Sequence, residues 1–332
     1  MQANLDSPVM LRLLSHAVSL ARKSGSEIRR ITLSGKLDVV DKSDGLLDYQ
    51  TEADRLVQRI IVANVSNKFP QCRIVGEEQL DEDLKKDQTL LIDQYDRDVL
   101  NMAIPESFKD LKESDLTIWV DPLDGTTEFV KGLLEHVTVL IGISCNGRSV
   151  AGVIHQPFHG YGIDSVNTGG KETLGEIAKL EGRTMWGLVG AGCFGIEPKC
   201  APGDRFIITT TASHSNANVE ESIANLKPDK VLKVGGAGYK ALLVLEGRAD
   251  AFVFTSNGCK RWDTGAPEAL LRAAGGQLTD SLGNQIDYTY GSEGDYHNTL
   301  GVIATLKAEI HSRVLKGIPE SVKERLQAKA QR

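Results

Sequence analysis

The chain has 332 residues, of which 41% are hydrophobic and 25% charged, so it holds enough apolar material for a packed core and is not a disordered chain. Its net charge of −7 argues against generic binding to nucleic acid or to an anionic membrane, because either would repel it. The five cysteines are scattered and form no C-x-x-C pair, which argues against a disulfide framework or a zinc knuckle.

No run of residues approaches the roughly 18 apolar positions of a membrane span, and the N-terminus lacks the basic and apolar regions of a secretory signal. The cytoplasm is therefore the expected location. At roughly 150 residues per domain, the length predicts two domains or one large layered body.

The first predicted element is an amphipathic helix with Ser7 as its N-cap, Pro8 in its first turn and Gly25 just beyond its end. A turn-rich stretch at 39–45 predicts a loop or a short hairpin. A second helix is expected from Thr51 to Lys68, because its apolar residues share one broad face and a proline follows.

A short strand is predicted at 73–75, and residues 79–115 are expected to form a solvated insertion with short helices. Further strands are predicted at 116–120, 137–145, 149–155, 186–189, 206–210, 231–234, 249–254 and 300–305. Asn146-Gly147 predicts a two-residue hairpin between two of them. The remaining predicted helices lie at 218–225, 238–246 and 263–274, with a closing helix from 307.

Helices and strands mix without strict βαβ alternation, and no internal repeat is present. This pattern predicts a layered α/β (α+β) fold with alternating helix and sheet layers, in preference to a doubly wound nucleotide-binding fold. Glycine and proline cluster between positions 180 and 205, so a boundary is placed there, between an N-terminal half at 1–190 and a C-terminal half at 191–332.

The segment Asp121-Pro122-Leu123-Asp124-Gly125 follows an apolar strand and is the most informative part of the chain. Two acids around one turn repel each other unless a cation lies between them, and hard divalent ions such as Mg²⁺ prefer carboxylate and carbonyl oxygens. The turn also directs the Leu123 carbonyl toward the two acids. The alternative is an Asx-turn, in which both aspartates only satisfy backbone N–H groups.

Other acids begin or end predicted elements. Glu77 and Glu78 follow a short strand, Asp54 lies in the first turn of the second helix, and Asp263 opens a later one. Taken singly, Asp54 and Asp263 fit helix caps better than metal ligands, and Glu78 is consistent with a surface charge.

Taken together, three motifs resemble the lithium-sensitive, magnesium-dependent inositol monophosphatase superfamily. They are Gly76-Glu77-Glu78, Trp119-Val-Asp-Pro-Leu-Asp-Gly-Thr126, and Trp262-Asp263 followed by Ala266-Pro267-Glu268. Residues 132–142, 211–216, 234–238 and 258–264 resemble the branch of that superfamily that acts on nucleotide bisphosphates. The resemblance extends from roughly the first helix to the end of the chain, and it implies an α/β/α/β/α sandwich.

The resemblance also implies two or three bound Mg²⁺ ions. Glu77, Asp121 and the Leu123 carbonyl would hold one ion, and Asp121, Asp124 and Asp263 would hold a second. These ligands all follow predicted strands or open a predicted helix.

For catalysis, the resemblance implies that Thr126 orients the attacking water and that Asp54 accepts the hydroxyl proton of Thr126. A threonine hydroxyl alone is too weak a base, but a carboxylate beside it allows a proton relay. The amides of Gly125 and Thr126, which open a helix, are expected to hold the phosphate. Nucleotide contacts would fall on Thr211, His214, Gly236 and Lys240, each of which also fits an ordinary strand, turn or surface position.

We therefore expect a phosphatase that converts adenosine 3′,5′-bisphosphate to AMP and phosphate. By resemblance it would also act on the sulfated analogue and on inositol 1,4-bisphosphate, and lithium would inhibit it. The expected partner is a small phosphorylated molecule, without nucleic acid or membrane, and the oligomeric state stays open. The alternatives are an inositol (poly)phosphate 1-phosphatase on the same fold, a non-catalytic nucleotide-bisphosphate sensor, and a structural protein whose acids hold calcium or magnesium for stability.

Overall fold

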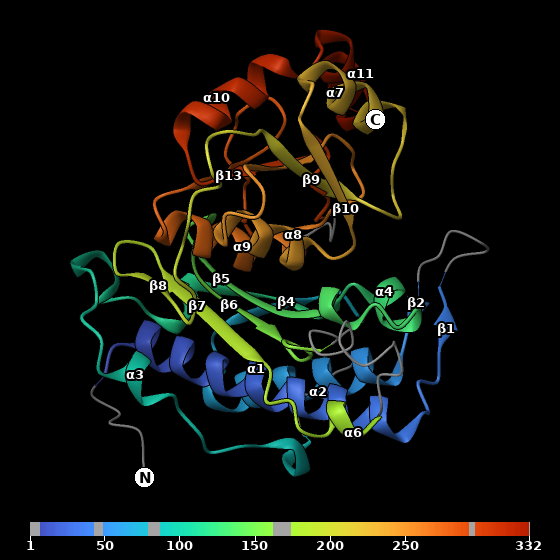
Figure 1. The fold of residues 1–332 in the computed structure, drawn as a ribbon. Helices are drawn as coiled ribbons and strands as arrows, with labels where there is room; N and C mark the ends of the chain where they lie inside the picture. The colour runs from blue at the N-terminus through green and yellow to red at the C-terminus, as the bar shows by residue number, and fades with distance from the viewer. Residues whose placement is uncertain (1–6, 43–48, 79–86, 162–173, 292–295, 332) are drawn as a thin grey trace.

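Five alternating layers of helices and sheets make up the protein in the computed structural model, which describes residues 7–42, 49–78, 87–161, 174–291 and 296–331. From bottom to top in Figure 1 they are a helix pair, a six-stranded sheet, a second helix pair, a five-stranded sheet and a final helical layer. The long helices of the three helical layers, in that order, are α1 (Val9–Ser34) and α2 (Glu52–Lys68), α8 (Ala237–Leu245) and α9 (Arg261–Ala273), and α7 (Ala217–Leu226), α10 (Ala308–Gly317) and α11 (Glu320–Ala330). The predicted layered fold class is confirmed.

The six-stranded sheet has the order β3-β4-β5-β6-β7-β8. Its strands are β3 (Arg73–Gly76), β4 (Leu116–Asp124), β5 (Thr138–Cys145), β6 (Arg148–Gln156), β7 (Arg183–Leu188) and β8 (Gly192–Phe194). Strand β3 runs parallel to β4, and all other neighbours are antiparallel. Asn146 and Gly147 both have positive φ, 50° and 72°, so the predicted tight turn between β5 and β6 is confirmed.

The five-stranded sheet has the order β10-β9-β11-β13-β12. Its strands are β9 (Ile207–Thr211), β10 (Lys230–Val234), β11 (Ala251–Phe254), β12 (Gln277–Thr279) and β13 (Val302–Thr305). The three-residue strands β8 and β12 are absent from the sequence-based prediction because they are too short to show a period. The single closing helix that we predicted is wrong: Pro319 separates α10 from α11.

The first helix ends at a different glycine from the one predicted. The predicted end at Gly25 is wrong, since α1 continues to Ser34 and Gly35 terminates it with φ 67°. Gly25 is instead a packing residue: a Cβ there would lie 2.0 Å from Nε2 of His155 on β6. The predicted N-cap is also displaced by one residue, because Pro8 occupies that position and makes no side-chain cap hydrogen bond.

The segment before β4 is mostly exposed and contains short helices, as predicted, but a few of its residues also pack against the body of the protein. Its described part, from residue 87, contains η2 (Gln88–Leu90), α3 (Arg97–Leu100), η3 (Glu106–Phe108) and η4 (Glu113–Asp115). Val99 is fully buried, and the Ser15 hydroxyl of α1 donates to the Asp96 carbonyl at 2.7 Å. The segment therefore covers one side of α1. The charge-dense part at 81–86 lies outside the described residues.

Helix α9 lies between the two sheets, and glycines make this possible. A Cβ at Gly142 of β5 would be 2.8 Å from the backbone of Gly265, and one at Gly152 of β6 would be 2.7 Å from Cα of Ala266. Side chains at these two strand positions would push the helix off the sheet. The close approach brings the start of α9 next to the end of β4.

The predicted division near residue 190 falls between β7 and β8, which pair with each other. The division stays a prediction. None of the helices in the described ranges is both long and apolar enough to cross a membrane.

Candidate active site

The two parallel strands β3 and β4 deliver acids to one edge of the lower sheet. Gly76 pairs with Val120, and the Glu77 N–H donates to the Val120 carbonyl at 3.0 Å. Glu77 therefore directly follows β3, and Asp121 lies at the next position of β4 after Val120. The parallel pairing is what places both carboxylates at the same end of the sheet.

The register of β4 against β5 shifts between Asp121 and Asp124, so the strand bulges at Pro122 and Leu123. Inside the bulge the Leu123 N–H donates to Oδ1 of Asp121 at 3.1 Å, which is the local bond of an Asx-turn. The turn interpretation is thus correct for Asp121. The Asp121 side chain also interacts with the Asp263 carboxyl group.

Asp124 joins the lower sheet to the middle helices. Its Oδ1 accepts a hydrogen bond from the Ala237 N–H at 2.7 Å, and its Oδ2 accepts from the Gly238 N–H at 2.8 Å and the Thr138 hydroxyl at 2.6 Å. These amides are at the N-terminus of α8, where an anion is electrostatically favoured. Gly236 is required there, because it has φ 71° and a Cβ would lie 2.9 Å from Asp124.

Asp54 and Asp263 are both helix caps and neighbours of the site. Asp54 forms a capping box at the start of α2 with Thr51, whose N–H donates to Oδ2 of Asp54 at 2.7 Å. Asp263 does the same for α9, where the Lys260 N–H donates to its Oδ2 at 2.6 Å. A capping box uses one carboxylate oxygen and fixes the direction of the other. The cap and the site roles are therefore compatible.

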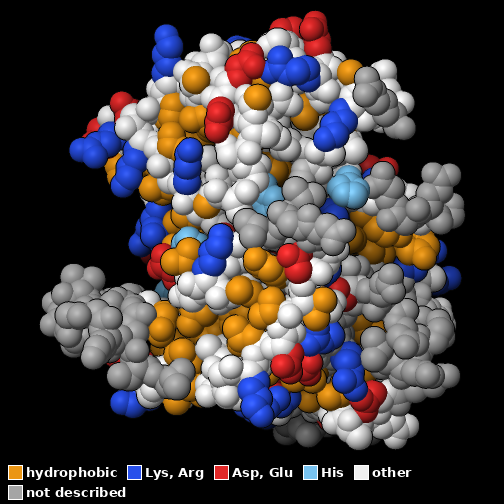
Figure 2. All heavy atoms as spheres, turned by 90° about the vertical axis from the view of Figure 1, so that its right-hand side faces the viewer, with side chains coloured by type: hydrophobic (Ala, Val, Ile, Leu, Met, Phe, Trp, Pro, Cys, Tyr) orange, Lys and Arg blue, Asp and Glu red, His pale blue; other side chains and the backbone are white. Residues whose placement is uncertain are grey.

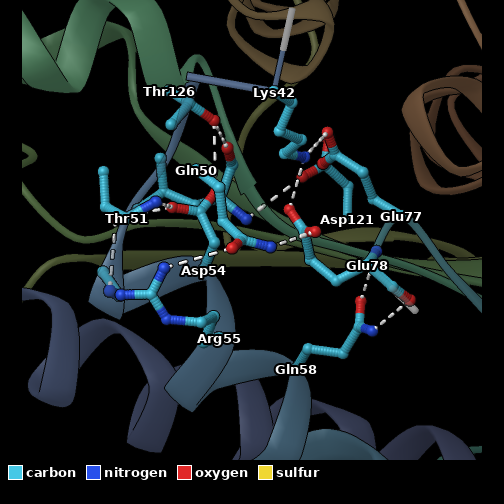
Figure 3. Close-up of polar contacts among 12 residues, drawn as sticks. Lys42, Gln50, Thr51, Asp54, Arg55, Gln58, Glu77, Glu78, Asp121 and Thr126 are labelled. Atoms are coloured by element: carbon cyan, nitrogen blue, oxygen red, sulfur yellow. Dashed lines mark hydrogen bonds and ion pairs between the residues drawn. The ribbon is translucent and has the colours of Figure 1, made fainter. Parts of the chain in front are cut away.

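Thr126 lies between two oxygen acceptors. Gly125, with φ 88°, turns the chain from β4 into the five-residue helix α4 (Thr126–Val130). The Thr126 hydroxyl then lies 3.2 Å from Oδ1 of Asp54 and 3.0 Å from the Leu123 carbonyl. Figure 3 shows Thr126 pointing toward the Asp54 carboxylate from the opposite side of the site.

The acids raise one another's pKa values. Burial raises the pKa of Glu77 to about 8 and that of Asp121 well above its ordinary value, and neighbouring carboxylates add to both shifts. Burial likewise raises the pKa of Asp124 and that of Asp54 to about 6 each. It also raises the pKa of Asp263 above its ordinary value. So many buried acids at one place need a cation to be ionised together.

The donor chemistry of this group fits Mg²⁺, which prefers carboxylate and carbonyl oxygens in a partly enclosed site. As the side chains stand, no three His, Cys, Asp or Glu residues in the described ranges have the spacing of a formed metal centre. The reason is visible in their partners. Asp124 is turned to the α8 amides, and the Lys42 ammonium lies 3.5 Å from Glu77 Oε1.

Lys42 and Glu78 also belong to the site, a role that the sequence analysis did not predict for either residue. Lys42 directly follows β1 (Val40–Asp41), which pairs with β2 (Tyr49–Gln50) in the short hairpin that we considered over 39–45; residues 43–45 lie outside the described ranges. The Lys42 ammonium is 2.6 Å from Glu78 Oε1, and Gln50 donates to the other Glu78 oxygen. Figure 3 shows Lys42 reaching between Glu77 and Glu78. Glu78 therefore anchors the hairpin and is not merely a surface charge.

One cavity of about 570 Å³, a size that suits a small-molecule ligand, is lined by Glu77, Asp121, Leu123, Asp124, Thr126 and Asp263, whereas Asp54, Lys42 and Glu78 lie outside its lining. The cavity also brings together Gly125 and the four residues that we associated with a nucleotide: Thr211, His214, Gly236 and Lys240. Thr211 and His214 contact each other, whereas Lys240 contacts Gly236. The Thr211 hydroxyl accepts from the His214 N–H at 3.0 Å.

Lys240 is an internal cation of the site. Its Nζ donates to the Gly236 carbonyl at 2.7 Å and lies 5.4 Å from the Phe252 ring centroid. Burial lowers its pKa, while the Asp124 carboxylate raises it. Lys260 and Trp262, which belong to the segment 258–264 named in the sequence analysis, also line the cavity. So do Tyr49, Glu128, Phe254 and His297, which the sequence analysis did not single out. No motif identifies them in advance.

Figure 2 shows the face on the side of β2 and α4, with acidic and basic side chains interspersed among hydrophobic ones. On that face the described residues form no continuous basic surface of the kind that follows a nucleic-acid backbone.

The chain belongs to the inositol monophosphatase family, because the family model with that description matches residues 10–323. It is 44% identical over 321 residues to the human protein named 3′(2′),5′-bisphosphate nucleotidase 1, and the match covers 97% of this chain and 98% of that protein. The predicted family and the predicted enzyme class, a phosphoric monoester hydrolase, are thereby confirmed.

Two solved structures share the fold. Thermotoga maritima IMPase has a TM-score of 0.63 at 23% identity, covering 94% of this chain and 98% of that one. An IMPase/NADP phosphatase complexed with Mg²⁺ and phosphate has a TM-score of 0.60 at 17% identity, covering 89% and 92%.

Proposed function

We propose that this enzyme removes the 3′-phosphate of adenosine 3′,5′-bisphosphate in a Mg²⁺-dependent reaction that yields AMP and inorganic phosphate. The sulfated analogue and inositol 1,4-bisphosphate would be further substrates, and lithium would inhibit the reaction. The observation that carries the proposal is the contact of the Thr126 hydroxyl with Asp54 beside the acids of the cavity. The name of the human relative supports the choice of substrate.

Mg²⁺, as two or three ions, would be held by Glu77, Asp121, the Leu123 carbonyl, Asp124 and Asp263, and when bound it would stabilise negative charge on the phosphoryl oxygens. The chain's own residues position the water. Thr126 accepts a proton from that water while its own hydroxyl proton passes to Oδ1 of Asp54. The water oxygen forms the new P–O bond, the bond to the 3′-oxygen breaks, and that oxygen takes up a proton from solvent.

The capping box of α2 holds Asp54 in place for this role. Its Oδ2 is occupied by the N–H and hydroxyl of Thr51, so only Oδ1 is directed at Thr126. A sensor that only binds a bisphosphate needs neither Thr126 nor Asp54 in this arrangement. We therefore prefer an enzyme to a sensor or a metal-stabilised structural protein.

The test is phosphate release by the purified full chain, with Mg²⁺ and with EDTA. The substrates are adenosine 3′,5′-bisphosphate, its sulfated analogue, inositol 1,4-bisphosphate and inositol 1-phosphate, each with a lithium titration. We expect the nucleotide to be the best substrate and Asp121→Asn to be inactive. Lys199→Ala, which removes an exposed lysine paired with Glu197, is the control.

Equal phosphate release by the wild type and Asp121→Asn would refute the proposal. Faster turnover of the inositol phosphates would instead indicate an inositol phosphatase on the same fold. Calorimetric binding of the nucleotide without product would indicate a sensor.

A further inference from the structure

The side chain of Glu128, on the short helix α4, lies at the wall of the cavity and is buried there to all but 5% of its surface. Within the described ranges its carboxylate makes no hydrogen bond and no ion pair, and Lys240 attracts it only at longer range. A buried acceptor of this kind costs free energy unless a donor reaches it. Its place on the cavity wall points to a donor that the ligand supplies.

Gly235, which precedes α8, makes room for this carboxylate. A Cβ at Gly235 would lie 1.8 Å from Cδ of Glu128 and 2.2 Å from each of its carboxylate oxygens. Gly235 is not among the glycines with positive φ, so its backbone conformation does not itself require glycine. An acid that only offsets the dipole of α4 needs no such opening, and α4 has no capping box at Gly125. The missing side chain at position 235 therefore serves the position of Glu128.

The Glu128 carboxylate lies beside the expected place of the reacting phosphate. A Cβ at Gly125, whose amide we expect to hold that phosphate, would be 3.7 Å from Oε2 of Glu128. An ionised carboxylate only accepts hydrogen bonds and repels a second anion. The ligand group that fits next to Glu128 is therefore an uncharged hydrogen-bond donor close to the phosphate, and a hydroxyl has this chemistry.

We propose that Glu128 accepts a hydrogen bond from the hydroxyl on the carbon next to the one that bears the reacting phosphate. In adenosine 3′,5′-bisphosphate this is the ribose 2′-hydroxyl. The inference rests on the proposed function, because it needs the 3′-phosphate to lie at Gly125 and the acids. Glu128 is then a specificity-determining residue: a hydrogen atom at that carbon leaves its carboxylate unpaired, and a second phosphate there is repelled.

The test compares adenosine 3′,5′-bisphosphate with its 2′-deoxy analogue. The two share the base and both phosphates, so the ratio of their kcat/KM values measures recognition of the 2′-hydroxyl alone. We expect the wild type to favour the ribonucleotide about 10- to 100-fold, and Glu128→Ala to bring the ratio to within about threefold of one. Glu128→Gln, which has nearly the same shape and keeps one acceptor oxygen, should retain part of the preference.

Gly235→Ala tests the same contact without changing the acid. The new methyl group would displace the Glu128 carboxylate, so the preference should fall in the otherwise wild-type chain. It should not change further when Gly235→Ala is added to Glu128→Ala, where the space is open. Glu197→Ala, which removes an exposed glutamate paired with Lys199, is the matched control and should keep the wild-type ratio.

A wild-type ratio close to one would overturn the inference. A Glu128→Ala variant that keeps the wild-type ratio would overturn it too, whatever its loss of rate on both substrates, because the side chain would then serve only the fold. Should Glu128→Ala fail to fold, the ratio in Gly235→Ala decides. Wild-type enzyme that hydrolyses neither nucleotide would instead refute the proposed function, and the wild type alone decides this.

Discussion

The Thr126 hydroxyl lies 3.2 Å from Oδ1 of Asp54, although the two residues belong to different helices in different layers. The same hydroxyl lies 3.0 Å from the Leu123 carbonyl. One proton can be donated to only one of these acceptors at a time. Transfer of that bond from the carbonyl to the carboxylate would make Thr126 a proton acceptor for water.

Removing the hydroxyl should therefore stop the reaction at its chemical step. We expect Thr126→Ala to lower kcat about 10²- to 10³-fold, and Thr126→Ser, which keeps the hydroxyl, to stay within about tenfold of the wild type. Steady-state phosphate release measures both. Retention of full activity by the alanine variant would remove Thr126 from the mechanism.

The acids of the cavity should stabilise the metal-free chain less as pH rises from about 4 to 8. The pKa of Glu77 is raised to about 8 and that of Asp124 to about 6, so in this window these two carboxyl groups bind more protons in the folded chain than in the unfolded chain. Saturating Mg²⁺ should restore stability, and by more at pH 8 than at pH 5.5. Thermal unfolding in EDTA and in Mg²⁺ at both pH values measures this. A Mg²⁺ effect that is equal at the two pH values would contradict the acid cluster as the binding group.

One further buried acid, Glu268, lies outside the lining of the cavity. Burial raises the pKa of Glu268 to about 7, its Oε2 has no hydrogen-bond partner, and Arg272 is 3.7 Å from Oε1. Its ordinary pKa is 4.5, so the folded state favours the protonated form, and the resulting stabilisation is lost as pH rises through 4.5 to 7.

We expect Glu268→Gln to be more stable than the wild type by about 3–4 kcal/mol at pH 8, because the rise in pKa from 4.5 to about 7 corresponds to about 1.4 kcal/mol per unit, and by little at pH 4.5. Urea unfolding at the two pH values measures the difference. Glu320→Gln, at a side chain that is 75% exposed, is the control. A difference that does not change with pH would argue that Glu268 is ionised in the fold.

Replacing Gly25 with alanine should have the opposite effect on stability to the usual glycine-to-alanine change inside a helix. Glycine to alanine inside a helix normally stabilises it by roughly 1 kcal/mol, but at Gly25 the new methyl would meet the His155 ring. We expect Gly25→Ala to destabilise the chain by about 1–3 kcal/mol. Gly203→Ala, where a Cβ would have no atom within 4 Å, is the control. If both variants are equally stable, α1 moves away from β6 more easily than the packing indicates.

The parts of the site that follow from local sequence were predictable. Asp54 and Asp263 each lie at the third position of a helix after a capping residue, and Asp121 follows the mostly apolar start of a buried strand, so their elements can be read from the chain. The prediction that these acids lie together in space came from the resemblance to a known family. The spacing of the acids alone could not distinguish a metal ligand from a helix cap, because Asp54 and Asp263 cap their helices and also border the site.

Other features depend on long-range contacts that leave no local signal. A glycine that ends a helix and a glycine that packs against a strand look alike in sequence, so Gly25 was misassigned. The segment from residue 87 buries Val99 through isolated apolar residues without helical or strand period, and so it resembled a surface insertion. Lys42 reaches the site only because the hairpin folds back onto Glu78.

The bonds from Asp124 to the amides of α8 fasten the lower sheet to the helix layer that supports the upper one. Separating the two sheets would leave the buried Asp124 carboxylate and two peptide N–H groups without hydrogen-bond partners. The two halves of the chain should therefore melt together, with one calorimetric peak whose enthalpy equals the van't Hoff value.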